Sequence, residues 1–324
     1  MNGDMTNHGV SPRRLFSRRE VLALGAGIGA AAALRIAPAF AAAAPLLTRP
    51  IPRSGERLPV VGIGTAIVFD IADDPARLAE RRAVIQTMIE GGARLIDTAP
   101  SYGAAETVVG GLLAEMNVRD KVFLATKVRA AGRDGSIAEM QQSLRRLRTD
   151  KLDLMQLHNV GPSAGDTAAQ IALLREWKDK GVFRYIGVTH FMESANERVS
   201  AAMQGEKLDF VQINYSMAER SVEQRLLGVA ADTGTAVLVN LPFGRGKLFS
   251  AVRGRQLPEW AAEFEAASWG QFFLKYILAQ EAVTCVIPGT DKPEYMLDNL
   301  NAGRGRLPDA AMRKKMVAFW ESLG

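Results

Sequence analysis

The segment LIDTAPSYG, residues 95–103, places a carboxylate and a phenol five residues apart. Asp97 closes an apolar run that is typical of a strand, and Tyr102 follows among Pro, Ser and Gly residues that indicate a loop. One explanation involves no chemistry: Asp97 or Ser101 could simply cap the next helix, because both residue types accept hydrogen bonds from free backbone amides. A chemical role needs partners for both groups elsewhere in the chain.

Two further polar residues lie at the ends of the next apolar runs: Lys127 is next to last in FLATKV, and His158 ends LMQLH. A lysine held beside a phenol lowers the pKa of that phenol, and an aspartate paired with the lysine offsets the cost of burying either charge. Taken singly, these residues have ordinary explanations as a helix cap, a surface lysine and a hydrogen-bonded core histidine. Taken together at neighbouring strand ends, the four side chains predict a catalytic cluster that exchanges protons with a substrate.

Such a cluster requires a scaffold that brings neighbouring strand ends together. Eight β-rich apolar runs alternate with segments of helical periodicity, which predicts an α/β fold whose parallel strands close into a (β/α)8 TIM barrel. Catalytic groups of these barrels lie at the C-terminal ends of strands, which are about 4.8 Å apart. A β-hairpin is expected before the first strand, and an additional C-terminal helix is expected within residues 306–324. The predicted strands are residues 60–68, 93–99, 121–128, 151–158, 183–190, 208–215, 235–242 and 282–289.

The first 44 residues differ in composition from the predicted barrel domain, residues 45–324. Arginine pairs precede a Gly/Ala/Leu run and an alanine-rich stretch, which is the order of a secretory signal. Arg18 and Arg19 resemble a twin-arginine (Tat) motif, and the apolar run is too short for a comfortable membrane span. We therefore expect residues 1–44 to be a Tat-type signal peptide. The protein would meet the Tat export machinery and reach the periplasm without stable membrane insertion.

Composition argues against several other classes. The whole chain carries a net charge of +5, of which +3 lies in the predicted signal peptide, and no basic run with interleaved aromatic residues follows it. A nucleic-acid partner is therefore not expected. The chain has three histidines, one of them (His8) in the predicted signal peptide, so a histidine-based metal site is not expected either. Cys285 is the only cysteine, and an intrachain disulfide is therefore impossible.

The cluster and its surroundings resemble the aldo-keto reductase superfamily over nearly all of residues 49–324. The resemblance runs in order through GIGT, LIDTAPSYG, FLATKV, SLRRLRTDKLDLMQLHN, YIGVTHF, VQINYS, LPFGRGKLF and VIPGTDKPEYMLDN. It implies a nicotinamide-dependent oxidoreductase that interconverts an aldehyde or ketone and the corresponding alcohol. By the resemblance, Tyr102 is the general acid, Lys127 paired with Asp97 tunes it, and His158 orients the carbonyl group.

The resemblance also implies a nucleotide site, with NADP expected first and NAD as the alternative. This chain departs from the family pattern at three places: at His190, which replaces Asn, at Asn240, which replaces a stacking Tyr, and near the adenosine ribose. There Tyr295 and Gly289 stand where many NADP-using members carry Arg or Lys, and only Arg forms a rigid fork for a 2′-phosphate. The expected cofactor-binding residues are Thr65, Asp97, Thr189, His190, Gln212, Pro242, Phe243, Gly244, Arg245, Gly289, Thr290, Asp291, Lys292, Asp298 and Asn299.

Two other classes of function remain open from the sequence. A redox sensor or interaction protein could hold the nucleotide on the same barrel without significant turnover, and turnover of a generic aldehyde would separate it from an enzyme. A hydrolase on this barrel would need paired carboxylates or metal ligands at the strand ends. The physiological substrate is left open by the sequence.

Overall fold

The computed structural model describes residues 44–161 and 166–323, so nearly all of the predicted signal peptide lies outside the described residues. Within them, eight parallel strands pair in chain order from β3 to β10, after a separate antiparallel pair, β1 and β2. The predicted barrel and N-terminal hairpin are confirmed. The strands are β1 (Thr48–Pro50), β2 (Arg57–Pro59), β3 (Ile63–Gly64), β4 (Leu95–Asp97), β5 (Phe123–Val128), β6 (Leu152–His158), β7 (Phe183–His190), β8 (Phe210–Asn214), β9 (Ala236–Asn240) and β10 (Val283–Val286).

The barrel closes between its first and last strands. Parallel bridges join Val61 to Val286 and Gly64 to Gly289, and the amide of Gly62 donates to the carbonyl of Val286 at 2.9 Å. The first strand is shorter than the predicted residues 60–68 because the chain turns at Ile67, whose φ of 68° is incompatible with a strand. This turn starts the loop that runs over the C-terminal mouth of the barrel.

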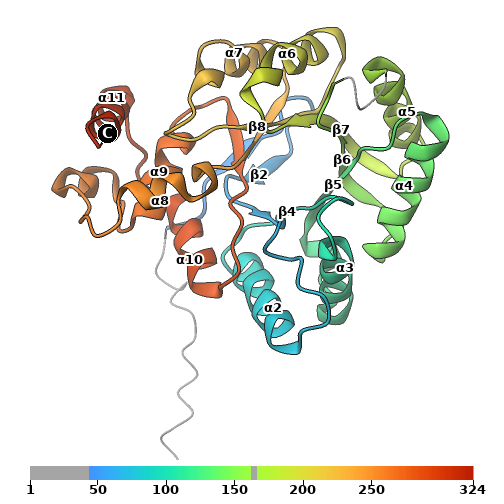
Figure 1. Cartoon of the computed structure of the whole chain (residues 1–324), viewed down its shortest axis with the longest axis horizontal. Helices are drawn as coiled ribbons and strands as arrows, with labels where there is room; N and C mark the ends of the chain where they lie inside the picture. The colour runs from blue at the N-terminus through green and yellow to red at the C-terminus, as the bar shows by residue number, and fades with distance from the viewer. Residues whose placement is uncertain (1–43, 162–165, 324) are drawn as a thin grey trace, which may run out of the picture. The chain divides into compact units, whose positions relative to one another are not determined.

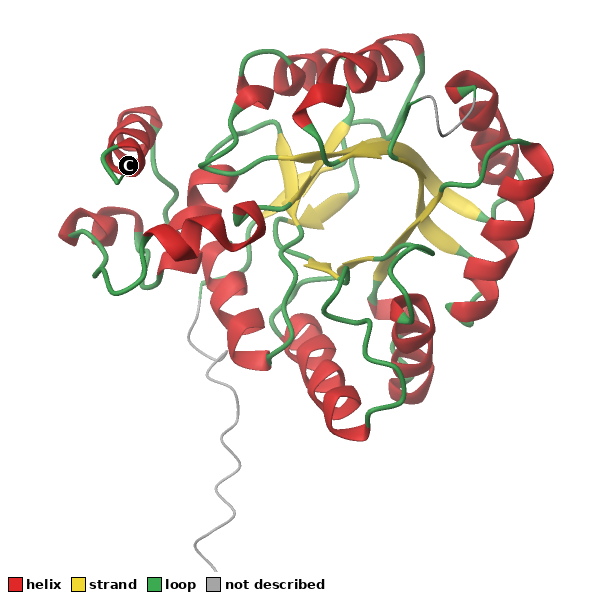
Figure 2. Cartoon of the chain, in the orientation of Figure 1, coloured by secondary structure: helices red, strands yellow, loops and turns green. Residues whose placement is uncertain are grey.

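Helices surround the ring of strands (Figures 1 and 2). The first of them shows how the sequence sets a boundary: Asp74 accepts from the amides of Ala76 and Arg77, Pro75 occupies the first turn, and Gly91 follows the last residue. The helices are α2 (Pro75–Glu90), α3 (Ala105–Met116), α4 (Arg133–Arg146), α5 (Thr167–Asp179), α6 (Asn196–Gly205), α7 (Leu226–Asp232), α8 (Lys247–Ala251), α9 (Trp269–Leu278), α10 (Pro293–Ala302) and α11 (Ala310–Glu321).

Helix α11 is the expected additional C-terminal helix. Its Arg313 donates to the Glu223 carboxylate at 2.8 Å and to the Tyr215 hydroxyl at 2.9 Å, and its guanidinium lies 4.4 Å from the centre of the Tyr276 ring. These contacts attach α11 to the barrel. None of the helices in the described residues has the length and apolarity needed to cross a membrane.

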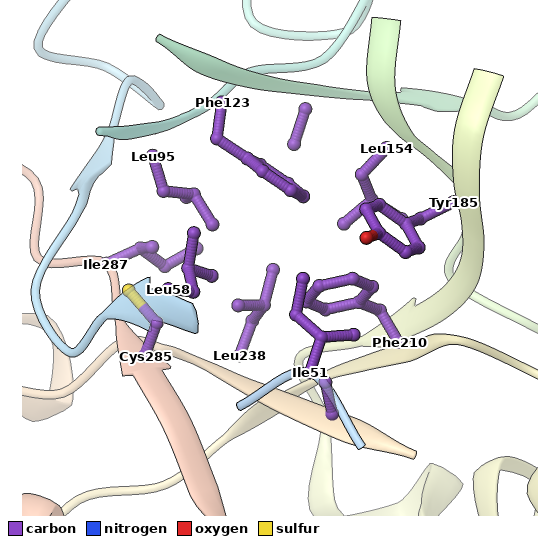
Figure 3. Packing of buried hydrophobic residues seen from close by; sticks show 12 residues of the cluster. Ile51, Leu58, Leu95, Phe123, Leu154, Tyr185, Phe210, Leu238, Cys285 and Ile287 are labelled. Carbon is purple, nitrogen blue, oxygen red and sulfur yellow. The ribbon is translucent and has the colours of Figure 1, made fainter. Parts of the chain in front are cut away.

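The floor of the barrel is filled by apolar side chains from alternate positions of the strands. Ile51 and Leu58 of the hairpin region lie in the same cluster, so the hairpin closes the N-terminal end of the barrel. Figure 3 shows these side chains converging inside the ring. Since side chains alternate along a strand, the residue two positions further on faces the same interior, one layer closer to the C-terminal mouth. The strand residues of the floor include Leu95, Phe123, Ala125, Leu154, Tyr185, Phe210, Ala236, Leu238 and Cys285.

Candidate active site

The second layer of the barrel interior is polar where the floor is apolar. Two positions beyond Leu95 the chain has Asp97, and two beyond Ala125 it has Lys127. The same step along β6, β8 and β9 gives further buried or half-buried polar residues: Gln156, Gln212 and Asn240. Strand periodicity therefore brings the predicted Asp97 and Lys127 together on top of the apolar floor.

Asp97 and Lys127 form a buried ion pair. The Lys127 ammonium donates to Oδ2 of Asp97 at 2.6 Å and to the carbonyl of Thr98 at 2.9 Å, and the lysine is completely buried. The other carboxylate oxygen of Asp97 accepts from Gln156 at 3.1 Å and from Gln212 at 2.8 Å. Both oxygens of Asp97 are thus hydrogen-bonded, as a buried charge requires.

The surroundings of Lys127 keep it protonated. Burial by itself would lower its pKa, but the negative charge of Asp97, the charge interaction with Tyr102 and the hydrogen bonds to both raise the pKa of Lys127 above its ordinary value. The ammonium also lies 4.9 Å from the centre of the Tyr102 ring. A fixed positive charge therefore stands next to the phenol.

Tyr102 lies in the loop between β4 and α3, and a neighbouring loop fixes its position. The amide of Ala104 donates to the Asp70 carboxylate at 2.9 Å. Gly103 has a φ of 58°, and a Cβ added there would lie 2.3 Å from the Asp70 carboxylate oxygen. Glycine is required for this close approach. Asp70 therefore ties the loop that follows β3 to the loop that carries the phenol.

His158 is held in its neutral form at the same mouth. Burial, followed by the positive charges of Lys127 and Arg129, lowers its pKa to about 3. Its ring meets that of Tyr102 edge to face, with centres 6.0 Å apart and an interplanar angle of 87°. A neutral imidazole can donate one N–H to an acceptor such as a carbonyl oxygen.

A cavity of about 580 Å³ opens above this layer and contains much of the predicted site. Lys127 lies beneath it, fully buried. Ten residues of the predicted site line the cavity: Thr65, Asp97, Tyr102, His158, Thr189, Gln212, Pro242, Phe243, Arg245 and Gly289.

The remaining predicted nucleotide residues lie outside the cavity lining. His190 accepts the amide of Met192 on its Nδ1 at 3.0 Å, and Asp298 accepts from Ser268 and Gln271, each at 2.7 Å. Asp298 therefore joins α10 to the start of α9. Gly244 lies between the lining residues Phe243 and Arg245, and Thr290, Asp291 and Lys292 directly follow Gly289. Asn299 is a buried residue of α10.

Sequence reasoning missed Gln156 and several residues of the cavity lining. Gln156 lies two residues before His158 on β6, so strand periodicity could have identified it as a partner of Asp97. Other cavity residues outside the predicted set include Ile67, Arg129, Asn159 and Phe191. They belong to loops, where no periodicity indicates which side chains face inward.

The lining fits a ligand that offers several hydrogen bonds. Among the described residues, Oγ1 of Thr65, Nδ1 of His158 and Oδ1 of Asn240 are buried without a hydrogen-bond partner, and all three residues line the cavity. Three successive residues from Gly244 to Gly246 also have positive φ, of 55°, 53° and 87°. The amides of Gly244 and Gly246 donate within the loop, to the carbonyls of Leu241 at 2.8 Å and Phe243 at 3.1 Å. The three unpartnered side-chain atoms, in contrast, fit the hydrogen-bonding groups of a nicotinamide dinucleotide.

Comparisons with known proteins agree with this geometry. The family described as "Aldo/keto reductase family" matches residues 60–316. The aldo-keto reductase YhdN of Bacillus subtilis (strain 168) is 33% identical over 177 residues, which are 51% of this chain and 52% of that protein. The NADH-specific methylglyoxal reductase of Escherichia coli (strain K12) is 27% identical over 304 residues, covering 77% of this chain and 91% of that protein.

Solved structures show the same fold. The aldo/keto reductase of Klebsiella pneumoniae in complex with NADP and acetate has a TM-score of 0.70 and 24% identity, and the match covers 82% of this chain and 93% of that chain. The chain belongs to the aldo/keto reductase family and is an NAD(P)-dependent oxidoreductase.

Proposed function

We propose that this oxidoreductase interconverts an aldehyde or ketone and the corresponding alcohol, with Tyr102 as the general acid or base. The observation that carries the proposal is the buried Lys127 ammonium, which lies 2.6 Å from Asp97 and 4.9 Å from the centre of the Tyr102 ring beneath the cavity. A purely structural barrel has no need to bury a lysine beside a phenol at its open end.

The nicotinamide nucleotide, when bound, supplies the hydride that reaches the carbonyl carbon. The neutral imidazole of His158 donates a hydrogen bond to the carbonyl oxygen and orients it. Tyr102 then gives its hydroxyl proton to that oxygen, and the Lys127 ammonium stabilises the phenolate that remains. Asp97 keeps the lysine charged and in place, and Gln156 and Gln212 hold Asp97. The reverse steps oxidise the alcohol.

NADP is the proposed cofactor, with NAD as the alternative. The exposed Lys292 lies beside the predicted adenosine end of the site, with its ammonium 5.7 Å from the centre of the Tyr295 ring. A lysine attracts a 2′-phosphate as a point charge. Solved relatives hold NADP or NADPH, whereas one relative is described as NADH-specific.

Export by the Tat pathway and residence in the periplasm are part of the proposal. They rest on the Arg18-Arg19 pair, the weakly apolar run and the alanine-rich stretch within residues 1–44.

Turnover of a generic aldehyde with each nucleotide tests the proposed function. Loss of reduced-nicotinamide absorbance should accompany the appearance of the alcohol, with a higher kcat/KM for NADPH than for NADH. Tight nucleotide binding without alcohol formation across a panel of aldehydes and ketones would instead identify a sensor or binding protein.

A further inference from the structure

Arg129 lies on the cavity wall next to the proposed catalytic groups. It comes directly after the last residue of β5, two positions beyond Lys127, and lines the same cavity as Tyr102 and His158. Its positive charge is one of those that lower the pKa of His158. The Arg129 charge therefore acts on the imidazole that is proposed to orient the carbonyl group.

The Glu139 carboxylate binds the backbone of the Arg129 loop. Glu139 accepts from the amide of Arg129 at 2.5 Å and from the amide of Ala130 at 2.8 Å. In the described part of the chain, no carboxylate oxygen lies within 4.0 Å of the Arg129 guanidinium. By contrast, the nearby Arg133 pairs with Glu176 at 2.6 Å. The Glu139 contacts fix the backbone of this loop and leave the Arg129 charge unpaired by any described acid.

The charge of the cavity lining is positive. Arg129 and Arg245 both line it, and Asp97, the acidic residue among the lining, is neutralised by Lys127. Arg245 belongs to the loop proposed for the pyrophosphate, and its guanidinium lies 5.1 Å from the centre of the Phe191 ring. Arg129 instead lines the cavity together with His158, whose pKa its positive charge helps to lower.

We propose that Arg129 binds an anionic substituent of the substrate, so that the preferred substrates are carbonyl compounds that carry a carboxylate. The inference rests on the proposed function and specifies its substrate class. A guanidinium offers a fork of donors that matches a carboxylate. The polar side chains of Ser101 and Asn159, which line the same cavity, can complete the hydrogen bonding of such a group.

The test compares aldehydes that differ only in this charge. The two pairs are 4-formylbenzoate with its methyl ester, and 4-oxobutanoate with its methyl ester, so that a rigid and a flexible spacing are both covered. The wild type should have the higher kcat/KM for each acid, and added salt should reduce this preference. Arg129→Gln should lower kcat/KM for the acids about tenfold or more, as expected for a lost hydrogen bond to a charged group. The ester values should change less than about threefold.

Arg198→Gln is the matched control, because Arg198 is exposed, lies outside the cavity lining and also adds positive charge near the end of β7. It should leave the preference for acids unchanged, and Arg129→Lys should restore part of it. Nucleotide affinity, measured by fluorescence titration, should be unaltered in Arg129→Gln. Three results would each overturn the assignment of Arg129 to the substrate anion. They are equal losses for acids and esters in Arg129→Gln, no preference for acids in the wild type, and weakened nucleotide binding as the only effect of Arg129→Gln. Absence of any aldehyde turnover in the wild type would instead refute the proposed function.

Discussion

At the scale of single residues, one buried cation organises the site. Lys127 joins the carboxylate that stabilises it to the phenol that it is proposed to activate. Its raised pKa means that folding favours the protonated lysine. The resulting stabilisation is complete below the ordinary value of 10.5 and is lost as the pH rises through the higher folded value. The ammonium is therefore present throughout the neutral range.

Replacement of Lys127 by methionine should lower kcat by about 10²-fold or more, because the phenolate left by proton transfer loses its counter-charge. It should also destabilise the fold by about 3–5 kcal/mol, because Asp97 becomes a buried charge without its partner. Steady-state kinetics and urea unfolding measure the two effects. The double variant Lys127→Met with Asp97→Asn should regain stability but not turnover, and recovery of both would contradict the catalytic role.

His158 should make the fold sensitive to acid. Its folded pKa of about 3 lies below the ordinary 6.5, so between these values the unfolded chain binds a proton that the folded protein does not. Its contribution to stability is therefore complete above pH 6.5 and decreases as the pH falls towards 3. Unfolding midpoints of the wild type should decline more steeply from pH 7 to pH 4.5 than those of His158→Asn. Parallel declines would show that His158 titrates normally.

At the scale of elements, a buried arginine connects two loops at the mouth of the cavity. Arg81 of α2 is 2% exposed, and it donates to the carbonyls of Val68 and Asp291, each at 2.6 Å. Val68 follows Ile67, which lines the cavity with a positive φ, and Asp291 belongs to the proposed nucleotide loop. One guanidinium thus sets the spacing between the two loops.

Arg81→Lys should raise the KM for both aldehyde and nucleotide, because one ammonium lacks the planar fork that bonds both carbonyls at once. We expect a loss of about tenfold in kcat/KM, as for one lost charged hydrogen bond. Arg49→Lys is the control, since Arg49 also binds backbone carbonyls, including that of Gln280 at 2.7 Å, but at the barrel floor. It should cost stability without changing KM. Similar kinetic effects from both variants would show that Arg81 acts only on stability.

The elements were more predictable than the loops between them. The alternation of β-rich apolar runs with helical segments indicated the barrel, and it placed Asp97, Lys127 and His158 at strand ends. Asp298 accepts from Ser268, and His190 accepts from the Met192 amide. No local sequence pattern predicts these partners, because they depend on how the fold brings the groups together. Gln156 was missed because a glutamine in a strand carries no chemical signature by itself. Strand β3 ends before the predicted residue 68 because the chain turns at Ile67, where φ is positive. Isoleucine is typical of strands, so the residue type did not predict this turn.

At the scale of the whole molecule, the two ends of the barrel have different roles, one in stability and the other in the proposed chemistry. The apolar floor and the hairpin supply packing, and the polar layer and loops supply the site. The proposed Tat signal adds a further requirement, because Tat carries folded proteins. A nucleotide bound only by the folded state stabilises it by about 2.7 kcal/mol at one hundred times its dissociation constant. We therefore propose that the protein is exported with its nucleotide bound.

Replacing Arg18 and Arg19 together by lysine should retain active protein in the cytoplasm, because lysine lacks the planar donor fork of arginine. Cell fractionation with an activity assay measures this, and unaltered export would refute Tat recognition.

Mass spectrometry of denatured periplasmic protein tests the proposal that the protein is exported with its nucleotide bound. Stoichiometric nucleotide is expected, and periplasmic protein without nucleotide would contradict co-export.

The central claim is that the Tyr102 hydroxyl supplies the proton to the carbonyl oxygen. The most direct measurement is the single-turnover rate of aldehyde reduction by Tyr102→Phe with saturating reduced nucleotide, followed by stopped flow. Because only the hydroxyl is lost, nucleotide affinity should stay within about twofold, whereas the rate should fall by about 10²–10⁴-fold, the usual contribution of general acid catalysis. A variant that retains more than about a tenth of the wild-type rate would contradict the assignment of Tyr102 as the proton donor.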